Sequence, residues 1–483
     1  MKKIPKILLI PLVIHLMFAV GLIYVQKPYE DEGLFGNAAY NLSYNGFMGI
    51  PGVEQGNDWV NLDKAVFWIP PASMVFSALW FKISGFGLFQ QRILAVFWGI
   101  LGIIAIYYFL KFLGFNKKNI FITLILVSTD FLYTRHSADG RICDIMCASV
   151  VFLSFTSYLL LREKNFRLAL LISNTFVMIA GLTHPNGLLG FFGLIFLALY
   201  FDLKKIVAKD MLISFIPYLV GGIGVSIYIL NNFDAFRSQF FGNINLAIEG
   251  RTVWSLIYSE IVSRYLFIYA GVGTKFAVYQ RFLIFIPLLY LLSFIYSGFK
   301  TKENDSIKIV FFLTLIFFVT STFLFGKKWP RYLIYIIPLY SCCISFMFTD
   351  LKNKIVRNAI GSWIVLVVVL SLGVNLYRFK RNEYGKHISD INKIKQIVPP
   401  NEDIIAPIEL GYSLDWGRIS ADGSIGYFSK KEYKFLIINS DYESYFELYK
   451  LTAPDIYRHI IKMLDEKYKV ILRGKIYKLY KHF

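Results

Sequence analysis

The sequence predicts an α-helical protein that crosses a membrane many times and carries a small α/β domain at its carboxyl terminus. Of its 483 residues, 56% are hydrophobic and only 17% are charged, whereas soluble domains contain about 25% charged residues. The hydrophobic residues gather in long runs separated by short basic loops, and this pattern ends near residue 376. No nucleic acid is expected as a partner, because the net charge of +19 is spread over these loops instead of covering one solvated face.

Eleven apolar runs are expected to cross the membrane as helices, each using most of the about 20 residues that a span requires. They lie at about residues 7–25, 91–112, 119–134, 142–161, 167–182, 188–201, 211–230, 280–298, 307–326, 332–349 and 358–376. A twelfth run, 66–84, is expected to form an interfacial or re-entrant helix, because Pro70 and Pro71 interrupt it and Lys64 and Lys82 flank it. The first run has no cleavage signature after Val25, so we expect it to remain as a span.

The charges of the short loops decide the topology, because Lys and Arg favour the cytoplasmic side. With the amino terminus inside and 66–84 not spanning, five basic loops fall inside: Lys117 and Lys118; Arg162, Lys164 and Arg167; Lys204, Lys205 and Lys209; Lys300, Lys302 and Lys308; Lys352, Lys354 and Arg357. If 66–84 spanned, all five would move outside. The sequence therefore predicts about 11 spans, outer loops at 26–90 and 231–279, and an extracytoplasmic carboxyl-terminal domain. Richness in Lys, Ile and Asn favours a plasma membrane of the bacterial inner-membrane type.

The expected domains are a membrane domain over residues 1–376 and an α/β domain over residues 377–483. In the second domain, isoleucines at helical spacing predict a helix over 388–397, and 454–467 is expected to form another. Strands are expected at 403–407, 434–439, 468–473 and 475–480. About 100 residues suffice for such a domain.

Acidic residues at the expected outer face are the first candidates for chemistry. Asp31 and Glu32 begin an interfacial helix whose apolar face carries Phe35, although Asp31 could simply cap that helix. Asp144 begins an apolar run, where a carboxylate costs about 2.5–3.5 kcal/mol at mid-depth. Its structural alternative is an ion pair with Arg141, three residues away on one helical face.

Basic residues accompany these acids in the short outer loops, where the positive-inside rule would not place them. The set consists of Lys64, Arg92, Arg135, Arg141, Lys327, Lys328 and Arg331. Carboxylates opposite cations suit a reaction in which a base removes a proton while cations stabilise an anionic leaving group, and phosphate is the natural anion. Snorkelling of these side chains to the membrane interface is the alternative.

The pattern of Asp31-Glu32, Lys64 with Pro70-Pro71, Arg92, and Arg141 with Asp144 resembles the GT-C membrane glycosyltransferases. The resemblance is to the branch of the protein O-mannosyltransferases and lipid A aminoarabinose transferases, and it is best over about residues 1–200. It implies two juxtamembrane helices in the first outer loop and a polyprenyl-phosphate sugar as donor. By similarity, Asp31 corresponds to the essential first-loop acid and Asp144 to the second-loop acid. Lys64 precedes Pro70 by six residues, whereas the family often has Lys directly before the double proline.

The function expected on these grounds is inverting transfer of a sugar from a polyprenyl-phosphate donor to a lipid, glycan or protein acceptor at the outer face of the membrane. Three sets of residues are assigned to it. The expected catalytic residues are Asp31, Glu32 and Asp144. The expected ligands of the donor phosphate are Arg92, Arg141, Lys64, Lys327, Lys328 and Arg331. The residues expected to bind the acceptor or support the others are Asp139, His184 and Arg135, of which Asp139 could instead serve a turn and His184 could close the end of a span.

Two points stay open at this level. A divalent metal ion, held by Asp31 and Asp144, is the one cofactor that the resemblance leaves open. The alternative functions are a transporter or lipid flippase and a catalytically silent assembly protein. Transporters usually contain inverted repeats and broken helices, and the sequence shows neither.

Overall fold

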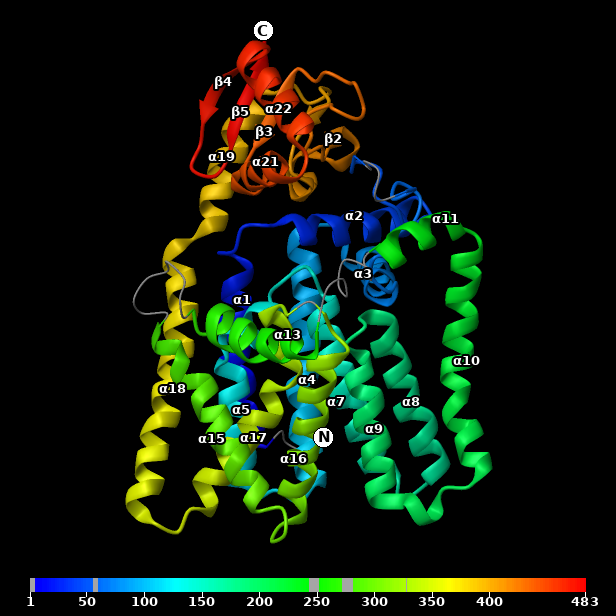
Figure 1. The fold of residues 1–483 in the computed structure, drawn as a ribbon, viewed down its shortest axis with the longest axis vertical. Coiled ribbons are helices and arrows are strands. Elements are labelled where there is room, and N and C mark those ends of the chain that lie inside the picture. Colours follow the sequence, from blue (N-terminus) through cyan, green and yellow to red (C-terminus); the bar gives the residue numbers. More distant parts are fainter. Residues whose placement is uncertain (1–4, 55–59, 243–251, 272–280, 327) are drawn as a thin grey trace.

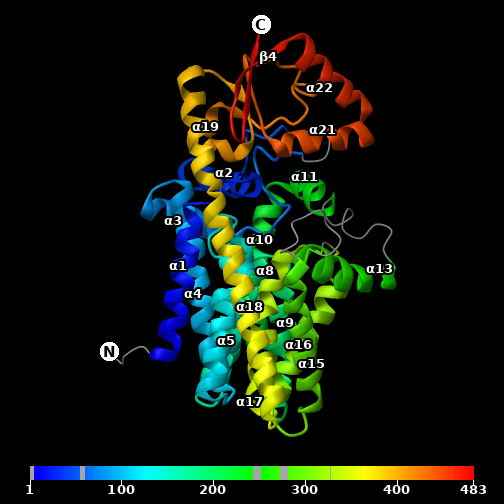
Figure 2. The same ribbon diagram turned by 90° about the vertical axis from the view of Figure 1, so that its left-hand side faces the viewer.

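The computed structural model describes residues 5–54, 60–242, 252–271, 281–326 and 328–483. Long helices stand roughly parallel in a bundle, two shorter helices lie across one end of it, and the carboxyl-terminal domain covers that same end (Figure 1, Figure 2). Within these residues, nine helices are long and apolar enough to cross a membrane. The chain is therefore a multi-pass helical membrane protein, as the sequence predicts.

The long bundle contains a helix in each of the eleven predicted runs. In chain order its helices are α1 (Lys6–Ile23), α4 (Leu88–Phe112), α5 (Lys117–Thr129), α6 (Phe131–His136), α7 (Cys143–Leu161), α8 (Phe166–Thr183), α9 (Gly187–Asp202), α10 (Ala208–Leu230), α15 (Phe285–Phe299), α16 (Asp305–Phe323), α17 (Ile337–Asp350) and α18 (Lys354–Arg381).

Two predicted spans are broken into shorter pieces. The 119–134 run divides at Asp130, whose carboxylate accepts hydrogen bonds from the backbone N–H groups of Leu132 and Tyr133 and thereby starts the new helix α6. The 332–349 run begins as the 3₁₀ helix η5 (Pro330–Tyr335) and becomes α-helical as α17, with Pro338 in its first turn. Both breaks occur at the end of the bundle that the carboxyl-terminal domain covers, and the second places Arg331 in η5.

The two helices that lie across the bundle are α2 (Glu30–Tyr44) and α3 (Ala72–Ser84) (Figure 1). They confirm the prediction of interfacial helices, although α3 begins only after Pro70 and Pro71 instead of at residue 66. The connections of the bundle hold short elements: η1 (Leu203–Lys205), α11 (Phe233–Phe236), η2 (Arg237–Phe241), α13 (Val253–Tyr258), η3 (Ser259–Tyr269) and η4 (Phe282–Ile284).

The five basic loops contact one another at the end of the bundle opposite the carboxyl-terminal domain. Thr349 donates a hydrogen bond of 2.6 Å to Asn119, and Lys300 lies 3.6 Å from Asp350. A second chain of contacts joins the remaining loops: Tyr200 donates to Asp305 and Arg162 pairs with Asp202. The loops therefore share one end, as the charge argument requires.

The carboxyl-terminal domain follows α18, which continues past residue 376 to Arg381. Asn382, with φ of 39°, then separates it from α19 (Glu383–Ile397). The remaining elements are β1 (Ile404–Ile405), η6 (Ile408–Leu410), α20 (Gly411–Leu414), η7 (Trp416–Arg418), β2 (Ile419–Ser420), β3 (Phe435–Ile438), α21 (Ser440–Thr452), α22 (Pro454–Glu466), β4 (Tyr468–Arg473) and β5 (Lys478–His482). The strand order is β2-β1-β3-β5-β4, with parallel pairing from β2 to β3 and antiparallel pairing from β3 to β4.

Helices cover both faces of this sheet. Ile437 of β3 packs with Ile391 and Ile394 of α19, whereas its neighbour Leu436 packs with Ile460 of α22. Successive side chains of a strand point to opposite faces, so β3 is buried on both sides. The predicted α/β character of the domain is confirmed.

The carboxyl-terminal domain rests directly on the first half of α2. A Cβ atom at Gly33 would lie 2.5 Å from the backbone nitrogen of Glu409, so only glycine permits this approach. The Tyr412 hydroxyl donates to the Glu32 carbonyl at 2.9 Å, and Trp416 joins the apolar cluster of Phe35. The domain thus fixes the helix that carries Asp31 and Glu32.

Candidate functional site

The centre of the candidate site is the carboxylate of Asp31, which two arginines share. Its Oδ2 lies 2.6 Å from Arg141 Nη1 and 2.9 Å from Arg331 Nη1. The three residues come from the first turn of α2, the loop before α7, and η5. The Asp31 side chain is 27% exposed and that of Arg331 18%. Among the described residues no hydrogen bond engages Asp31 Oδ1, so a carboxylate flanked by two cations faces an accessible space.

Asp144 lies on the buried side of Arg141. Arg141 Nε is 3.2 Å from Asp144 Oδ2, which confirms the predicted ion pair, and His184 Nε2 is 3.7 Å from Oδ1. The Asp144 carboxylate is fully buried, yet neither oxygen accepts a well-aligned hydrogen bond from a described residue. A buried polar group without a hydrogen bond costs about 1–3 kcal/mol. This energetic cost indicates that Asp144 has a role, either in positioning Arg141 or in binding a ligand.

The turn between α8 and α9 adds two polar side chains to this site, those of His184 and Asn186. The Nδ1 atom of His184 accepts a hydrogen bond of 3.1 Å from the Asn186 backbone, so the proton of a neutral ring lies on Nε2, toward Asp144. Burial lowers the pKa of His184 to about 4, so the ring is neutral at pH 7. The side-chain amide of Asn186 is also buried without a partner among the described residues. Asn186 was not among the predicted residues, although its place beside His184 was a signal.

Glu32 and Arg92 form a closed buried pair, and this arrangement does not fit the roles predicted for them. Arg92 Nε and Nη2 each lie 2.7 Å from the Glu32 carboxylate, and its other donors bind the carbonyl oxygens of residues 23, 26 and 27. All five N–H groups of the guanidinium are therefore engaged, and none is left for a phosphate. Glu32 also accepts a hydrogen bond of 2.6 Å from the Gly140 backbone. The pair joins α2 and α4 to the loop of Arg141, so we correct both assignments to structural ones.

Lys328 does not fit its predicted role either. Its ammonium donates to the carbonyl oxygens of Ser321 and Thr322 at 2.6 and 2.7 Å and pairs with Glu260 at 3.0 Å. Its side chain is buried, so this cation joins the end of α16 to η3. Lys327 lies outside the described residues.

Asp139 stabilises the loop that presents Arg141. Its carboxylate accepts hydrogen bonds from the Tyr29 hydroxyl at 2.8 and 3.0 Å and from the Arg141 backbone at 2.9 Å. Burial alone would raise its pKa, but His136 and Arg135 lower the pKa of Asp139 to about 2. Asp139 is therefore ionised at neutral pH and links the start of α2 to this loop.

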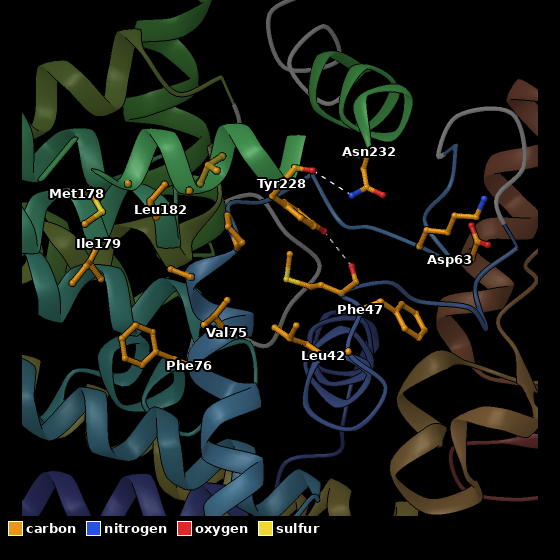
Figure 3. Close-up of a pocket in the computed structure, with 18 of the residues that line it drawn as sticks. Leu42, Phe47, Asp63, Val75, Phe76, Met178, Ile179, Leu182, Tyr228 and Asn232 are labelled. Carbon is orange, nitrogen blue, oxygen red and sulfur yellow. Dashed lines mark hydrogen bonds between the residues drawn. The ribbon is translucent and has the colours of Figure 1, made fainter. Parts of the chain in front are cut away.

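A groove of about 1010 Å³ runs between α2 and α3 on one side and α8 and α10 on the other (Figure 3). At one end its walls are apolar, with Val75 and Phe76 facing Ile179 and Leu182. At the other end lie Asp63 and Asn232, and Lys64 lines the groove as well. Lys64 is exposed. The groove therefore has the dimensions and the polarity for a lipid chain with a polar head.

A second cleft, of about 750 Å³, places Arg135 apart from Asp31. Arg135 and Lys27 line it together with Arg378 of α18, and its apolar walls include Phe131 and Val374. Tyr29, which binds Asp139, also lines this cleft. Arg135 therefore lies in a neighbouring basic cleft instead of pairing with Asp31.

A divalent metal ion does not fit between Asp31 and Asp144 as they are arranged. The guanidinium of Arg141 contacts both carboxylates, at 2.6 and 3.2 Å, and so takes the position that a shared cation would need. The described part of the chain contains no group of three or more His, Cys, Asp or Glu side chains placed to hold a metal.

Comparison with known proteins supports the fold. No family model matches the chain, and no curated protein matches it by sequence. The structure is similar to ArnT from Cupriavidus metallidurans bound to undecaprenyl phosphate, with a TM-score of 0.57 and 14% identity over 98% of this chain and 97% of that one. It is also similar to the oligosaccharyltransferase of Archaeoglobus fulgidus, with a TM-score of 0.58 and 12% identity over 98% of this chain and 74% of that one. The predicted GT-C fold is therefore confirmed.

Proposed function

We propose that this protein is an inverting glycosyltransferase that uses a polyprenyl-phosphate sugar as donor. The observation that carries the proposal is the sharing of Asp31 Oδ2 between Arg141 and Arg331. A base next to two planar cations suits the displacement of a phosphate from an anomeric carbon. The similarity in fold to ArnT bound to undecaprenyl phosphate, and to AglB in complex with a dolichol-phosphate, supports a donor of this kind.

Binding of the donor would rearrange the two ion pairs. A phosphate offers oxygen atoms that accept paired hydrogen bonds from guanidinium groups, so it competes with Asp31 for Arg141 and Arg331. Each arginine that turns to the phosphate releases Asp31 Oδ2. Asp31 Oδ2 thus loses its two ion pairs only when the donor is in place.

The reaction then follows from these positions. Asp31 takes the proton of an acceptor hydroxyl or amine as that atom attacks the anomeric carbon from the face opposite the phosphate. The bond between the anomeric carbon and the phosphate oxygen breaks, and the oxygen keeps the electron pair. Arg141 and Arg331 stabilise the negative charge on the leaving polyprenyl phosphate. Asp144 and His184 act through Arg141, because they contact it or its partner from the buried side.

The groove of Figure 3 fits the lipid chain of the donor, and Lys64 is among the residues that line it. We place this end of the bundle at the outer face of the membrane, because the five basic loops lie at the opposite end. The carboxyl-terminal domain is then extracytoplasmic.

The test is mass spectrometry of lipids and surface glycans from cells with the wild-type gene, without it, and with Asp31→Asn. We expect loss of one sugar from a glycan or lipid and accumulation of the polyprenyl-phosphate sugar in both altered strains. Asp455→Asn, an exposed change in α22, is the matched control and should behave as the wild type. Unchanged glycans in the deletion strain would refute the proposal. A lipid flippase would instead retain function in Asp31→Asn provided that the helices still pack.

A further inference from the structure

A third cavity, of about 330 Å³, lies between the membrane domain and the carboxyl-terminal domain, and Glu30 at the start of α2 lines it. Its walls come from the start of α2, the segment after residue 52, η6 and α21. All charged residues among the described ones that line it are acidic: Glu30, Glu54, Glu409 and Asp441. This charge is opposite to that of the arginines around Asp31, so the cavity does not suit a phosphate.

Tyrosines give this cavity aromatic surface and an unused hydroxyl group. Tyr442, Tyr445 and Tyr449 of α21 line it. The Tyr442 hydroxyl is buried and makes no hydrogen bond within the described residues. An unpaired buried hydroxyl is unfavourable by about 1–3 kcal/mol. A ligand with hydroxyl groups would supply the missing partner, and flat aromatic rings stack well on the C–H faces of sugars.

The carboxylates of the cavity indicate the charge of that ligand. Burial, together with the nearby carboxylates of Asp441 and Glu30, raises the pKa of Glu409 to about 8. Lys27 compensates only part of this charge, at 3.7 Å from Asp441. An ammonium group placed among these carboxylates and tyrosine rings would gain charge-assisted hydrogen bonds and cation–π contacts.

The cavity is joined to the proposed catalytic base through one residue. Tyr445 donates a hydrogen bond of 2.5 Å to Glu30 Oε2, and Glu30 directly precedes Asp31 in the first turn of α2. A ligand in the cavity would therefore contact Glu30, the residue that directly precedes Asp31. Its wall from the carboxyl-terminal domain is held in place by the close approach of Gly33 to Glu409.

We propose that this cavity binds the acceptor through a sugar unit that carries a free amine. The assignment as acceptor rests on the proposed glycosyl transfer, whereas the binding of an amino sugar does not. The acceptor is thus a glycan or glycolipid that presents a hexosamine with an unsubstituted amino group. Asp441 and Glu409 bind the ammonium, and Glu409 releases its proton when the ammonium binds. Tyr442 binds a ring hydroxyl, and Glu30 orients the sugar toward Asp31.

Two disaccharides that differ only in the amine provide the test. The β-1,4-linked disaccharide of glucosamine and its N-acetylated counterpart are titrated into the full-length protein in nanodiscs, with calorimetry as the readout. The wild type should bind the free amine at least about tenfold more tightly, because acetylation removes the charge. Glu409→Gln and Tyr442→Phe, both close in shape to the original residues, should each reduce binding of the free amine by about tenfold.

Glu447→Gln is the matched control, because Glu447 lies on the same helix, α21, with its side chain 71% exposed. It should bind like the wild type, and thermal unfolding should confirm that all variants are folded. Equal binding of the two disaccharides, no binding of either, or unchanged binding by both Glu409→Gln and Tyr442→Phe would overturn the inference. If the free amine binds while the glycan analysis shows no sugar transfer, the cavity inference stands and the proposed function fails. If sugar is transferred but neither disaccharide binds, only the cavity inference fails.

Discussion

Replacement of Arg92 by Met should lower the free energy of unfolding of the protein and leave the proposed catalytic residues unchanged. The change removes the ion pair of 2.7 Å with Glu32 and the hydrogen bonds to three backbone carbonyl groups. Glu32 would keep only the N–H groups of Gly140 and Tyr29, at 2.6 and 3.3 Å. Breaking a buried pair by removing one partner costs about 3–5 kcal/mol. We expect a loss of stability of this size for Arg92→Met and for Glu32→Gln.

The double variant separates the pair from the rest of the structure. Once Arg92 is replaced, the buried Glu32 carboxylate has no cationic partner. Glu32→Gln should therefore reduce the stability less in that background than in the wild type. The double variant should therefore lose about 1–3 kcal/mol less than the sum of the two single changes. Unfolding by SDS in mixed micelles, followed by tryptophan fluorescence, measures all four proteins.

Arg331→Met is the matched control for the same chemical change. Its side chain is 18% exposed and its ion pair with Asp31 spans 2.9 Å near the surface of the site. Such a partly exposed pair contributes about 0–1 kcal/mol, so stability should change little while sugar transfer is lost. The reverse result, in which Arg92→Met retains full stability and loses transfer, would show that Arg92 binds the donor and that the structural assignment is wrong.

Three further predictions test other parts of the argument. Lys64→Ala should raise the Michaelis constant for the lipid donor and leave turnover nearly unchanged, because Lys64 lies on the groove and not beside Asp31; loss of turnover alone would contradict this. Cysteines placed at Lys117 or Lys205 should resist a membrane-impermeant thiol reagent in intact cells, whereas one at the exposed Lys462 should react. The four native cysteines are buried, so they should contribute little labelling. The opposite labelling pattern would reverse the topology. Because the folded pKa of Glu409 is about 8, above its ordinary 4.5, its neutral form stabilises the fold below pH 4.5, and this stabilisation is lost as the pH rises through 8. The melting temperature of the wild type should therefore fall over this range more than that of Glu409→Gln, and parallel curves would exclude Glu409 as the cause.

Hydropathy and loop charge were sufficient for most of the fold. Each predicted apolar run contains a helix, although α3 begins after Pro70 and Pro71 instead of at residue 66. The breaks at Asp130 and before Pro338 were not predicted, because an apolar run does not reveal where a side chain will cap a new turn. In the carboxyl-terminal domain, α21 was missed, since its sequence is rich in tyrosine and charge and lacks a clear apolar stripe.

The site residues show a sharper limit. Asp31 and Glu32 are neighbours in sequence, but consecutive residues of a helix point about 100° apart. One therefore faces the two arginines, and the other is buried against Arg92. Which of them is buried depends on α4, some 60 residues away in the sequence, and on Tyr412 of the carboxyl-terminal domain. No local pattern contains that information.

The positions of the charges also explain why the chain keeps several costly buried groups at one end. Glu32 with Arg92 fixes α2, Asp139 fixes the loop of Arg141, and Asp144 holds Arg141 from below. These contacts hold Arg141 from the buried side, whereas its partner on the other side, Asp31, is 27% exposed. A cation restricted in this way exchanges a carboxylate for a phosphate with little loss of side-chain entropy, because its other contacts persist. In the proposed mechanism, the buried acids therefore hold Arg141 ready for the donor, and the exposed acid, Asp31, is the one that the donor would release for the chemistry.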